Sequence, residues 1–221
     1  MTSTPLLRLG LPILILIFGA NAAAKASSIC DGVIGNLVTN CGFENGSAHG
    51  PNGASTPLNW STSNLWSYEQ VTHFPELANS GSYYYRIGNT SYLGASTLSQ
   101  SFVDTAGEDY TFSFFLYDTA IPFENTDDIE FFASWNSGSP LLSLINTATP
   151  TTYTEYSFTV LGTGHDTISF SAYNNRGSYY LDDVSVVETS PSPVPEPNSL
   201  AFLGTGLLGA IGAIRRKMFS V

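Results

Sequence analysis

Between Asn36 and Glu188 the chain is written in short runs of alternating apolar and polar residues, with turn residues between the runs. Period-two alternation is typical of half-buried β-strands. Strict alternation occurs in three segments, Tyr110–Phe114, Glu155–Val160 and Thr167–Tyr173. A fourth segment, Ile129–Trp135, is a run rich in β-forming residues. No window of a dozen residues has helical periodicity, and there is no internal repeat. Many short strands with regular turns predict an all-β jelly-roll β-sandwich, with long loops over the less patterned stretch 49–75.

The N-terminus has the pattern of a signal helix. Arg8 precedes an unbroken apolar run, Leu9–Ala20, and small residues follow it. The triplet Ala24-Lys25-Ala26 predicts a signal peptide at 1–26 and a mature start near Ser27, and Ala22-Ala23-Ala24 is an alternative cleavage site. An uncleaved anchor helix is the other interpretation, although the apolar run is short for a membrane span. We therefore expect an exported protein whose sandwich domain spans 27–188.

The C-terminus combines a stiff linker with a short apolar helix. Residues 189–198 are rich in proline, and residues 199–221 contain the apolar run Leu200–Ile214 followed by cations. As a helix this run reaches only about 22 Å, whereas the hydrocarbon core of a bilayer is about 30 Å thick. Cations beside a span stay on the cytoplasmic side, so the domain is predicted to face outward.

This tail resembles the PEP-CTERM sorting signal of exported bacterial proteins. The matching residues are the Val-Pro-Glu-Pro motif and the basic cluster, namely Val194, Pro195, Glu196, Pro197, Arg215, Arg216 and Lys217. The resemblance implies an exosortase-type membrane protease as partner, which cuts near Pro-Glu-Pro. It also implies transient retention in the inner membrane through the hydrophobic helix, and then release to the cell surface or extracellular matrix. A permanent tail anchor is the alternative.

Charge is distributed unevenly along the chain. Of the 18 acidic residues, 17 lie between Cys30 and Glu188, where Arg86 and Arg176 are the only Lys or Arg. So acidic a domain repels DNA and anionic lipid, which argues against a nucleic-acid partner. It favours cations, neutral polymers or basic partners, although an acidic surface often serves solubility alone.

The two cysteines, Cys30 and Cys41, lie close together at the start of the expected mature chain. In an oxidising compartment such a pair is expected to form a disulfide, worth roughly 2–3 kcal/mol for so short a loop. The disulfide would hold the first strand in place. With no further Cys or His nearby, a zinc site is not expected.

The two ends of the domain carry acidic residues in apolar surroundings. By strict alternation, Asp182 points inward with Val184 and Val186 in the last strand, and Glu44 follows Phe43 in an apolar opening strand. Buried carboxylates are costly unless they are paired or bind a metal. If the first and last strands lie together, Glu44 and Asp182 would suit Ca²⁺. The alternative is that they cap turns or accept bonds from backbone amides.

These two ends, Asn36–Gly46 and Tyr180–Val186, resemble those of carbohydrate-binding modules with a galactose-binding-like jelly roll. The resemblance implies that fold and a structural Ca²⁺ near the two ends, held by Glu44 and Asp182, with Asp183 as a further candidate. Cys41 stands where the family usually has Gly or Ser, which is consistent with an added disulfide.

Sugar sites use flat aromatic side chains, and three are candidates for binding an extracellular polysaccharide: Trp66, Tyr68 and Trp135. Trp60 and the run Tyr83–Tyr85 are further candidates, although the residue at the position of Trp60 usually lies in the core in the family. A purely structural matrix component is the alternative. A glycoside hydrolase using Asp127, Asp128 or Glu130 is less favoured, because Asp128 and Glu130 share a polar strand face and no nucleophile motif occurs. We therefore expect a non-catalytic module.

Overall fold

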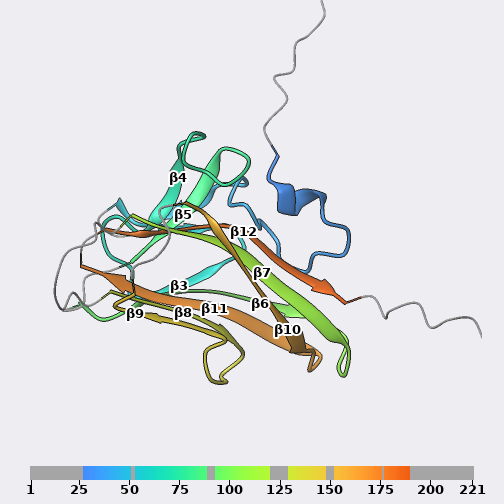
Figure 1. The fold of residues 1–221 in the computed structure, drawn as a ribbon. Coiled ribbons are helices and arrows are strands. Elements are labelled where there is room, and N and C mark those ends of the chain that lie inside the picture. Colours follow the sequence, from blue (N-terminus) through green and yellow to red (C-terminus); the bar gives the residue numbers. More distant parts are fainter. Residues whose placement is uncertain are drawn as a thin grey trace, which may run out of the picture.

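Two five-stranded sheets packed face to face form the domain, as the two layers in Figure 1 show. The computed structural model describes residues 27–50, 53–88, 93–119, 129–147, 152–175 and 177–189. The predicted signal peptide, nearly all of the linker and the apolar tail lie outside these ranges. Within them, no helix is both long enough and apolar enough to cross a membrane.

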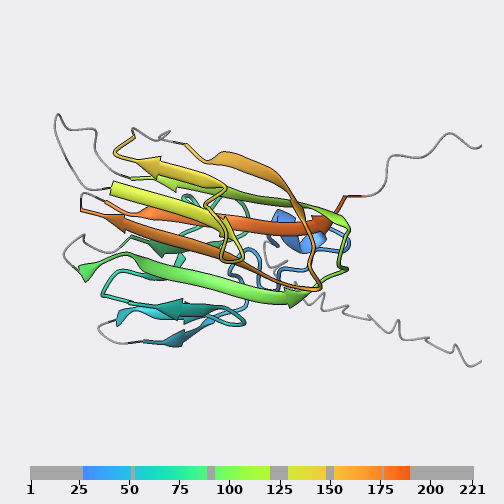
Figure 2. The same cartoon turned by 90° about the horizontal axis from the view of Figure 1, so that it is seen from below.

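All strand pairs in the two sheets are antiparallel. The upper sheet in Figure 1 has the order β10 (Thr154–Leu161), β7 (Asp109–Asp118), β12 (Tyr179–Glu188), β5 (Tyr83–Ile87), β4 (Gln70–His73). The lower sheet has the order β3 (Ser61–Ser63), β6 (Ser96–Val103), β11 (His165–Asn174), β8 (Ile129–Trp135), β9 (Leu142–Ile145). A small hairpin pairs β1 (Ser47–His49) with β2 (Ser55–Pro57). Figure 2 shows the lower sheet from below. The predicted all-β jelly-roll sandwich is confirmed.

The core is made of aromatic rings that the alternation places between the sheets. In β7 every second residue is buried, and the Phe114 ring lies edge-on to that of Phe170 in β11 at 5.0 Å between centroids. Trp60 also belongs to the core, and its indole N–H donates to the carbonyl of Asn40 at 3.2 Å. The four segments with strand patterns all form strands, β7, β8, β10 and β11, because each buries one face against the opposite sheet.

The opening segment, residues 36–46, departs from the prediction of a first strand. It forms turns, since Asn40 (φ 52°) and Phe43 (φ 61°) adopt left-handed conformations that a strand cannot accommodate. It still runs beside the last strand: Leu37 N–H donates to the Val186 carbonyl at 2.9 Å, and Val184 N–H donates to the Cys41 carbonyl at 3.0 Å. The two ends of the domain therefore do lie together.

The predicted disulfide between Cys30 and Cys41 is confirmed. It does not hold a strand, however. It joins the short 3₁₀ helix η1 (Ile29–Gly32) to the turns of the opening segment, next to β12 (Figure 1). The stretch 49–75 also differs from the prediction of long loops. It contains β2, β3 and β4, which were missed because each is only three or four residues long.

Candidate carboxylate cluster and aromatic face

A bulge in β12 breaks the alternation of its side chains. The pairing of β12 with β7 shifts between Asp182 and Ser185, and Asp183 has a left-handed φ of 47°. Leu181 faces the core before the bulge and Val184 faces it after the bulge. The expectation that Asp182 points inward with the valines is therefore wrong, because the bulge adds a residue and reverses the parity. Asp182 lies on the outer side of the sheet.

Asp182 is nevertheless fully buried, because the end of the β4–β5 connection covers it. One carboxylate oxygen accepts the backbone N–H groups of Asn79 (2.8 Å) and Ser80 (3.4 Å), and the other accepts the N–H of Asp183 (2.8 Å). Burial, followed by the neighbouring Asp183 carboxylate, raises the pKa of Asp182 to about 9, although the hydrogen bonds lower it. Burial thus favours the protonated form of Asp182, and its hydrogen-bond partners are backbone N–H groups.

Glu44 holds the other half of the same connection. Its Oε1 accepts the N–H groups of Ser82 at 2.6 Å and of Tyr83 at 2.8 Å. Between the two halves, Gly81 has a φ of +65°, and a side-chain carbon there would collide with Glu44 Oε1. Glu44 and Asp182 are therefore brought together by segment 79–83, on whose amides both act as acceptors.

Asp183 lies at the centre of a set of hydroxyl and amide donors. It accepts the Ser80 hydroxyl at 2.7 and 2.8 Å, the Asn79 side-chain N–H at 2.8 Å, and the Ser28 hydroxyl. Ser28 is buried against Gly42, where any side-chain carbon would collide with it. Ser28 and Glu44 also flank Gly81. A side-chain carbon added at Gly81 would collide with Glu44 Oε1 and would lie 3.3 Å from the backbone N of Ser28.

The three predicted metal ligands offer hard-oxygen donors, but their ligand atoms do not all lie within 4.8 Å of one another. Glu44, Asp182 and Asp183 are all buried. Across the described ranges Arg86 is the only Lys or Arg, and its guanidinium donates to Ser178 Oγ at 2.7 Å, so it does not serve the cluster. Buried carboxylates without a basic side chain are what Ca²⁺ neutralises. All three carboxylates already accept hydrogen bonds, Asp182 and Glu44 from backbone N–H groups and Asp183 mainly from side chains.

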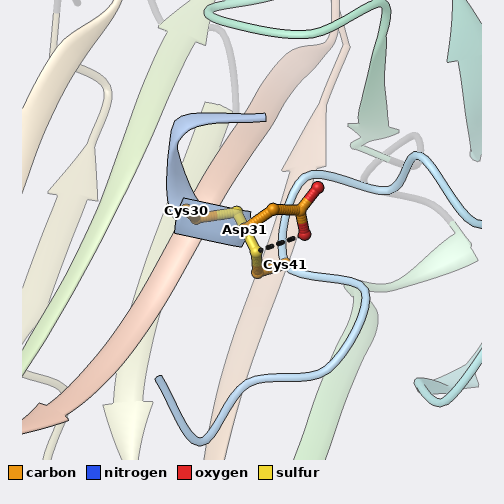
Figure 3. A group of neighbouring side chains, drawn as sticks. All are labelled: Cys30, Asp31 and Cys41. Atoms are coloured by element: carbon orange, nitrogen blue, oxygen red, sulfur yellow. Dashed lines mark hydrogen bonds between the residues drawn. A yellow bond between two sulfur atoms is a disulfide. The ribbon is translucent and has the colours of Figure 1, made fainter. Parts of the chain in front are cut away.

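A second group of potential ligands surrounds the disulfide. In the part of the chain that the structure describes, Cys30, Asp31 and Cys41 are the only His, Cys, Asp or Glu trio whose ligand atoms all lie within 4.8 Å of one another. Figure 3 shows that both sulfurs are joined to each other and that Asp31 reaches Cys41 Sγ at 3.4 Å. Disulfide sulfurs are not thiolates, so this trio is not a metal site.

Two of the three predicted ligand-binding aromatics lie together. Trp66 and Tyr68, in the β3–β4 connection, have 43% and 66% of their surfaces exposed. The guanidinium of Arg86 lies 5.2 Å from the centre of the Tyr68 ring. Buried Glu69 fixes this connection, since its carboxylate accepts the N–H groups of Trp66 (2.7 Å) and Gly88 (3.4 Å).

Trp135 does not join them. It lies at the far end of the sandwich, where its ring packs 5.6 Å from that of Phe102 and its indole N–H donates to the Leu161 carbonyl at 3.2 Å. Glu130, one of the residues considered for a hydrolase, lies on β8 beside the buried Phe131 and faces away from the core. Asp127 and Asp128 lie outside the described residues.

The outer side of the upper sheet carries a row of four tyrosines, of which the sequence indicated only Tyr84. Tyr84 (β5), Tyr180 (β12), Tyr117 (β7) and Tyr153 (just before β10) follow the order of the strands across the sheet. Successive ring centroids lie 4.4, 5.4 and 5.7 Å apart. The row spans three strand spacings, roughly 14 Å. Alternation within each strand signals an outward tyrosine, but only the strand order brings the four together.

A cleft of about 280 Å³ opens at the Tyr117–Tyr153 end of this row. Its walls are the two rings and Thr152 on one side and the β4–β5 connection on the other, through Glu76, Leu77 and Ala78. The hydroxyl oxygen of Tyr153 is buried without a hydrogen-bond partner. Burial, and then the neighbouring Asp182, raise the pKa of Tyr153. The cleft thus combines two aromatic rings with one exposed acid.

Comparison with known proteins supports both the sorting signal and the fold. Residues 193–217 match the model of the PEP-CTERM protein-sorting motif. The chain carries a PEP-CTERM sorting motif. The predicted residues Val194–Pro197 and Arg215–Lys217 all fall within the matched range. A search of curated proteins finds no match.

Similar solved structures include carbohydrate-binding modules. The complex of TmCBM61 with β-1,4-galactotriose is 19% identical and has a TM-score of 0.50, with coverage of 70% of this chain and 99% of that one. A CBM4 structure is 15% identical, with a TM-score of 0.40 and coverage of 69% and 99%. The enzymatically active domain of bacteriophage CBA120 tailspike protein 4 is 16% identical, with a TM-score of 0.47 and coverage of 70% and 21%. The likeness to TmCBM61 shows a shared jelly-roll fold.

Proposed function

We propose that this PEP-CTERM protein is a non-catalytic module that binds extracellular polysaccharide at the cell surface or in the extracellular matrix. The observation that carries the proposal is the row Tyr84–Tyr180–Tyr117–Tyr153 with its terminal cleft. Tyr84 is buried, whereas Tyr117, Tyr153 and Tyr180 are half-buried, so these three are held by the sheet and remain partly accessible. Fixed, partly exposed aromatic faces suit the apolar faces of pyranose rings.

The direction of the row supports an extended ligand. Its four rings come from neighbouring strands, so it crosses the sheet at right angles to them. Arg86 shares the outer side of β5 with Tyr84 and is paired with Tyr180 of β12, so Tyr68, stacked on Arg86, adds an exposed ring beside the row. A polymer lying along this line would meet several rings in succession. Trp66 and Tyr68 therefore remain ligand candidates on the same side of the domain, whereas Trp135 would serve a separate site.

Sorting supplies the location in this proposal. An exosortase-type protease would cut near Pro195–Pro197 after the apolar tail has held the protein in the inner membrane. The short length of the tail and its terminal cations suit temporary retention. The domain would then act outside the membrane, where the Cys30–Cys41 disulfide persists.

A structural Ca²⁺ is part of the proposal. Glu44 and Asp183 would hold the ion, with the Ser28 hydroxyl beside them, and Asp182 would support segment 79–83. The buried negative charge and the hard-oxygen donors favour this ion. The ion would neutralise the cluster and tie the opening segment, the β4–β5 connection and β12 to one point.

The test is binding of the full mature domain to oligosaccharides, measured by calorimetry. Suitable probes are β-1,4-galactotriose and the producer's own polysaccharide. Tyr117→Ala should weaken binding about tenfold, in line with the loss of one stacked ring. Tyr173→Ala is the matched control, because Tyr173 is equally half-buried but lies on β11 in the other sheet. Absence of binding to every probe, or an equal loss in both variants, would favour a purely structural matrix protein.

A further inference from the structure

The cleft at the end of the tyrosine row differs from the rest of the row in having an acid in its wall. Glu76 is exposed and borders the same cleft as Tyr117 and Tyr153. A second exposed acid, Glu155, is paired with Phe115 of β7 and lines a different cleft, with Asp183 and Ser185. A ligand in the cleft would therefore meet two aromatic faces with negative charge beside them.

No Lys or Arg of the described residues lines the cleft, and the nearest histidine in the sequence is the exposed His73, three residues before Glu76. Arg86, the one Lys or Arg in those ranges, lies toward the opposite end of the row. There it is held by Ser178 and by the Tyr68 ring. An anionic sugar such as a uronate would find no partner at the cleft and would be repelled by Glu76.

We propose that the cleft selects polysaccharides that carry protonated amines, such as a partly deacetylated amino-sugar polymer. This inference rests on the proposed polysaccharide-binding function and assigns its ligand class. The ammonium group would pair with the Glu76 carboxylate, while the faces of Tyr117 and Tyr153 attract the same cation through their ring quadrupoles. The tyrosine rings would also stack on the apolar face of the sugar. Adjacent side chains would therefore bind both the ammonium group and the sugar ring.

The test compares two matched ligands, the hexamer of β-1,4-linked glucosamine and its fully N-acetylated form. Measurements at mildly acidic pH keep the amines protonated while Glu76 is ionised. The free-amine hexamer should bind about tenfold more tightly, as one exposed ion pair and a cation–π contact allow. Glu76→Gln should reduce this preference to about threefold or less. Glu108→Gln should leave it unchanged, because Glu108 is an equally exposed acid in the β6–β7 turn at the other end of the sheet.

The main competing explanation for an amine preference is non-specific attraction of the polycationic hexamer to the acidic domain. The preference should therefore disappear in Tyr117→Ala and persist in Tyr173→Ala. Equal affinity for the two hexamers, or a preference that survives both Glu76→Gln and Tyr117→Ala, would overturn the inference. Tyr117-dependent binding of the acetylated hexamer or of galactotriose without an amine preference would leave the proposed function standing. Failure of all of these ligands to bind would count against both.

Discussion

Glu44 and Asp182 bind successive halves of one short segment, although they lie at opposite ends of the domain sequence. Asp182 accepts the N–H groups of Asn79 and Ser80, and Glu44 accepts those of Ser82 and Tyr83. Gly81 lies between the two pairs, where an added side-chain carbon would collide with Glu44. The β4–β5 connection, which also forms one wall of the cleft, is thus fixed by carboxylates from the opening segment and from β12.

Gly81→Ala should destabilise the domain by on the order of 3 kcal/mol, because the new methyl group meets Glu44 Oε1 in addition to the cost of a left-handed alanine. Gly107→Ala is the matched control. Gly107 also has a positive φ (+90°), but nothing lies within 4 Å of its missing side chain, so only the conformational cost of about 1 kcal/mol applies. Urea denaturation of both variants measures the difference. Equal losses would mean that Glu44 yields to the methyl group without cost.

The proposed Ca²⁺ site predicts that removal of the ion lowers the melting temperature of the mature domain. With the ion gone, the Glu44 and Asp183 carboxylates repel each other in a buried site, and mass action no longer favours the folded state. Excess chelator should lower the melting temperature by several degrees, which calorimetric scanning would detect. Glu44→Gln and Asp183→Asn should each abolish this response.

Asp31→Asn provides the control for that experiment, since Asp31 is an exposed acid next to the disulfide. Its chelator response should match that of the unmodified chain. An identical melting curve with and without chelator would rule out a stabilising Ca²⁺ and leave the backbone amides as the only role of the cluster. In the proposed arrangement Asp182 supports segment 79–83 and does not hold the ion, so Asp182→Asn should retain the response.

The fold was largely predictable because alternation reports which face of a strand is buried, as in β7, where Phe112 and Phe114 face the core. Alternation failed where one residue leaves the extended conformation. Asp183 in β12 and Phe43 in the opening segment are both left-handed, and neither is a glycine that would mark the change. The proximity of Glu44 to the acids of β12 was predicted from the two ends of the domain, but their shared partner segment was not.

The aromatic face shows the other limit. Trp66 and Tyr68 were recognisable from an irregular stretch of sequence, and both are exposed. Tyr117 and Tyr180 were not, because each looks like an ordinary strand residue until the order of the sheet places β7 beside β12. Contacts between distant strands depend on topology, which local patterns do not encode.

A second pair of acids, Asp104 and Asp166, lies at the far end of the sandwich. Asp166 is fully buried and accepts the Asn136 side-chain N–H (2.5 Å) and both the N–H (2.7 Å) and hydroxyl (2.5 Å) of Thr163. Burial acts to raise the pKa of Asp166, but hydrogen bonds from Asp104, Thr163 and Asn136 lower it to about 2. Burial and the bond to Asp166 raise the pKa of Asp104. The pKa values of the two neighbouring acids therefore shift in opposite directions.

This pair should make stability depend on pH in two opposite ways. The ordinary pKa of both acids is 3.8. The contribution of Asp166 is present above this value and is lost as the pH falls toward 2, because protonation removes the acceptor. The contribution of Asp104 is present below 3.8 and is lost as the pH rises through its raised pKa. The pair should therefore stabilise the domain most near pH 4.

Urea denaturation across this pH range tests the prediction, with the double variant Asp104→Asn/Asp166→Asn as reference. Relative to that reference, the unmodified chain should have a maximum in the free energy of unfolding near pH 4. Asp104→Asn should lose only the decline above the maximum, because Asp166 keeps its bonds to Thr163 and Asn136. Asp166→Asn should lose the decline toward pH 2. If the free energies of unfolding of the unmodified chain and of the double variant differ by the same amount at every pH, the two acids do not titrate as a coupled pair. A decline on only one side of the pH maximum would assign the effect to a single acid.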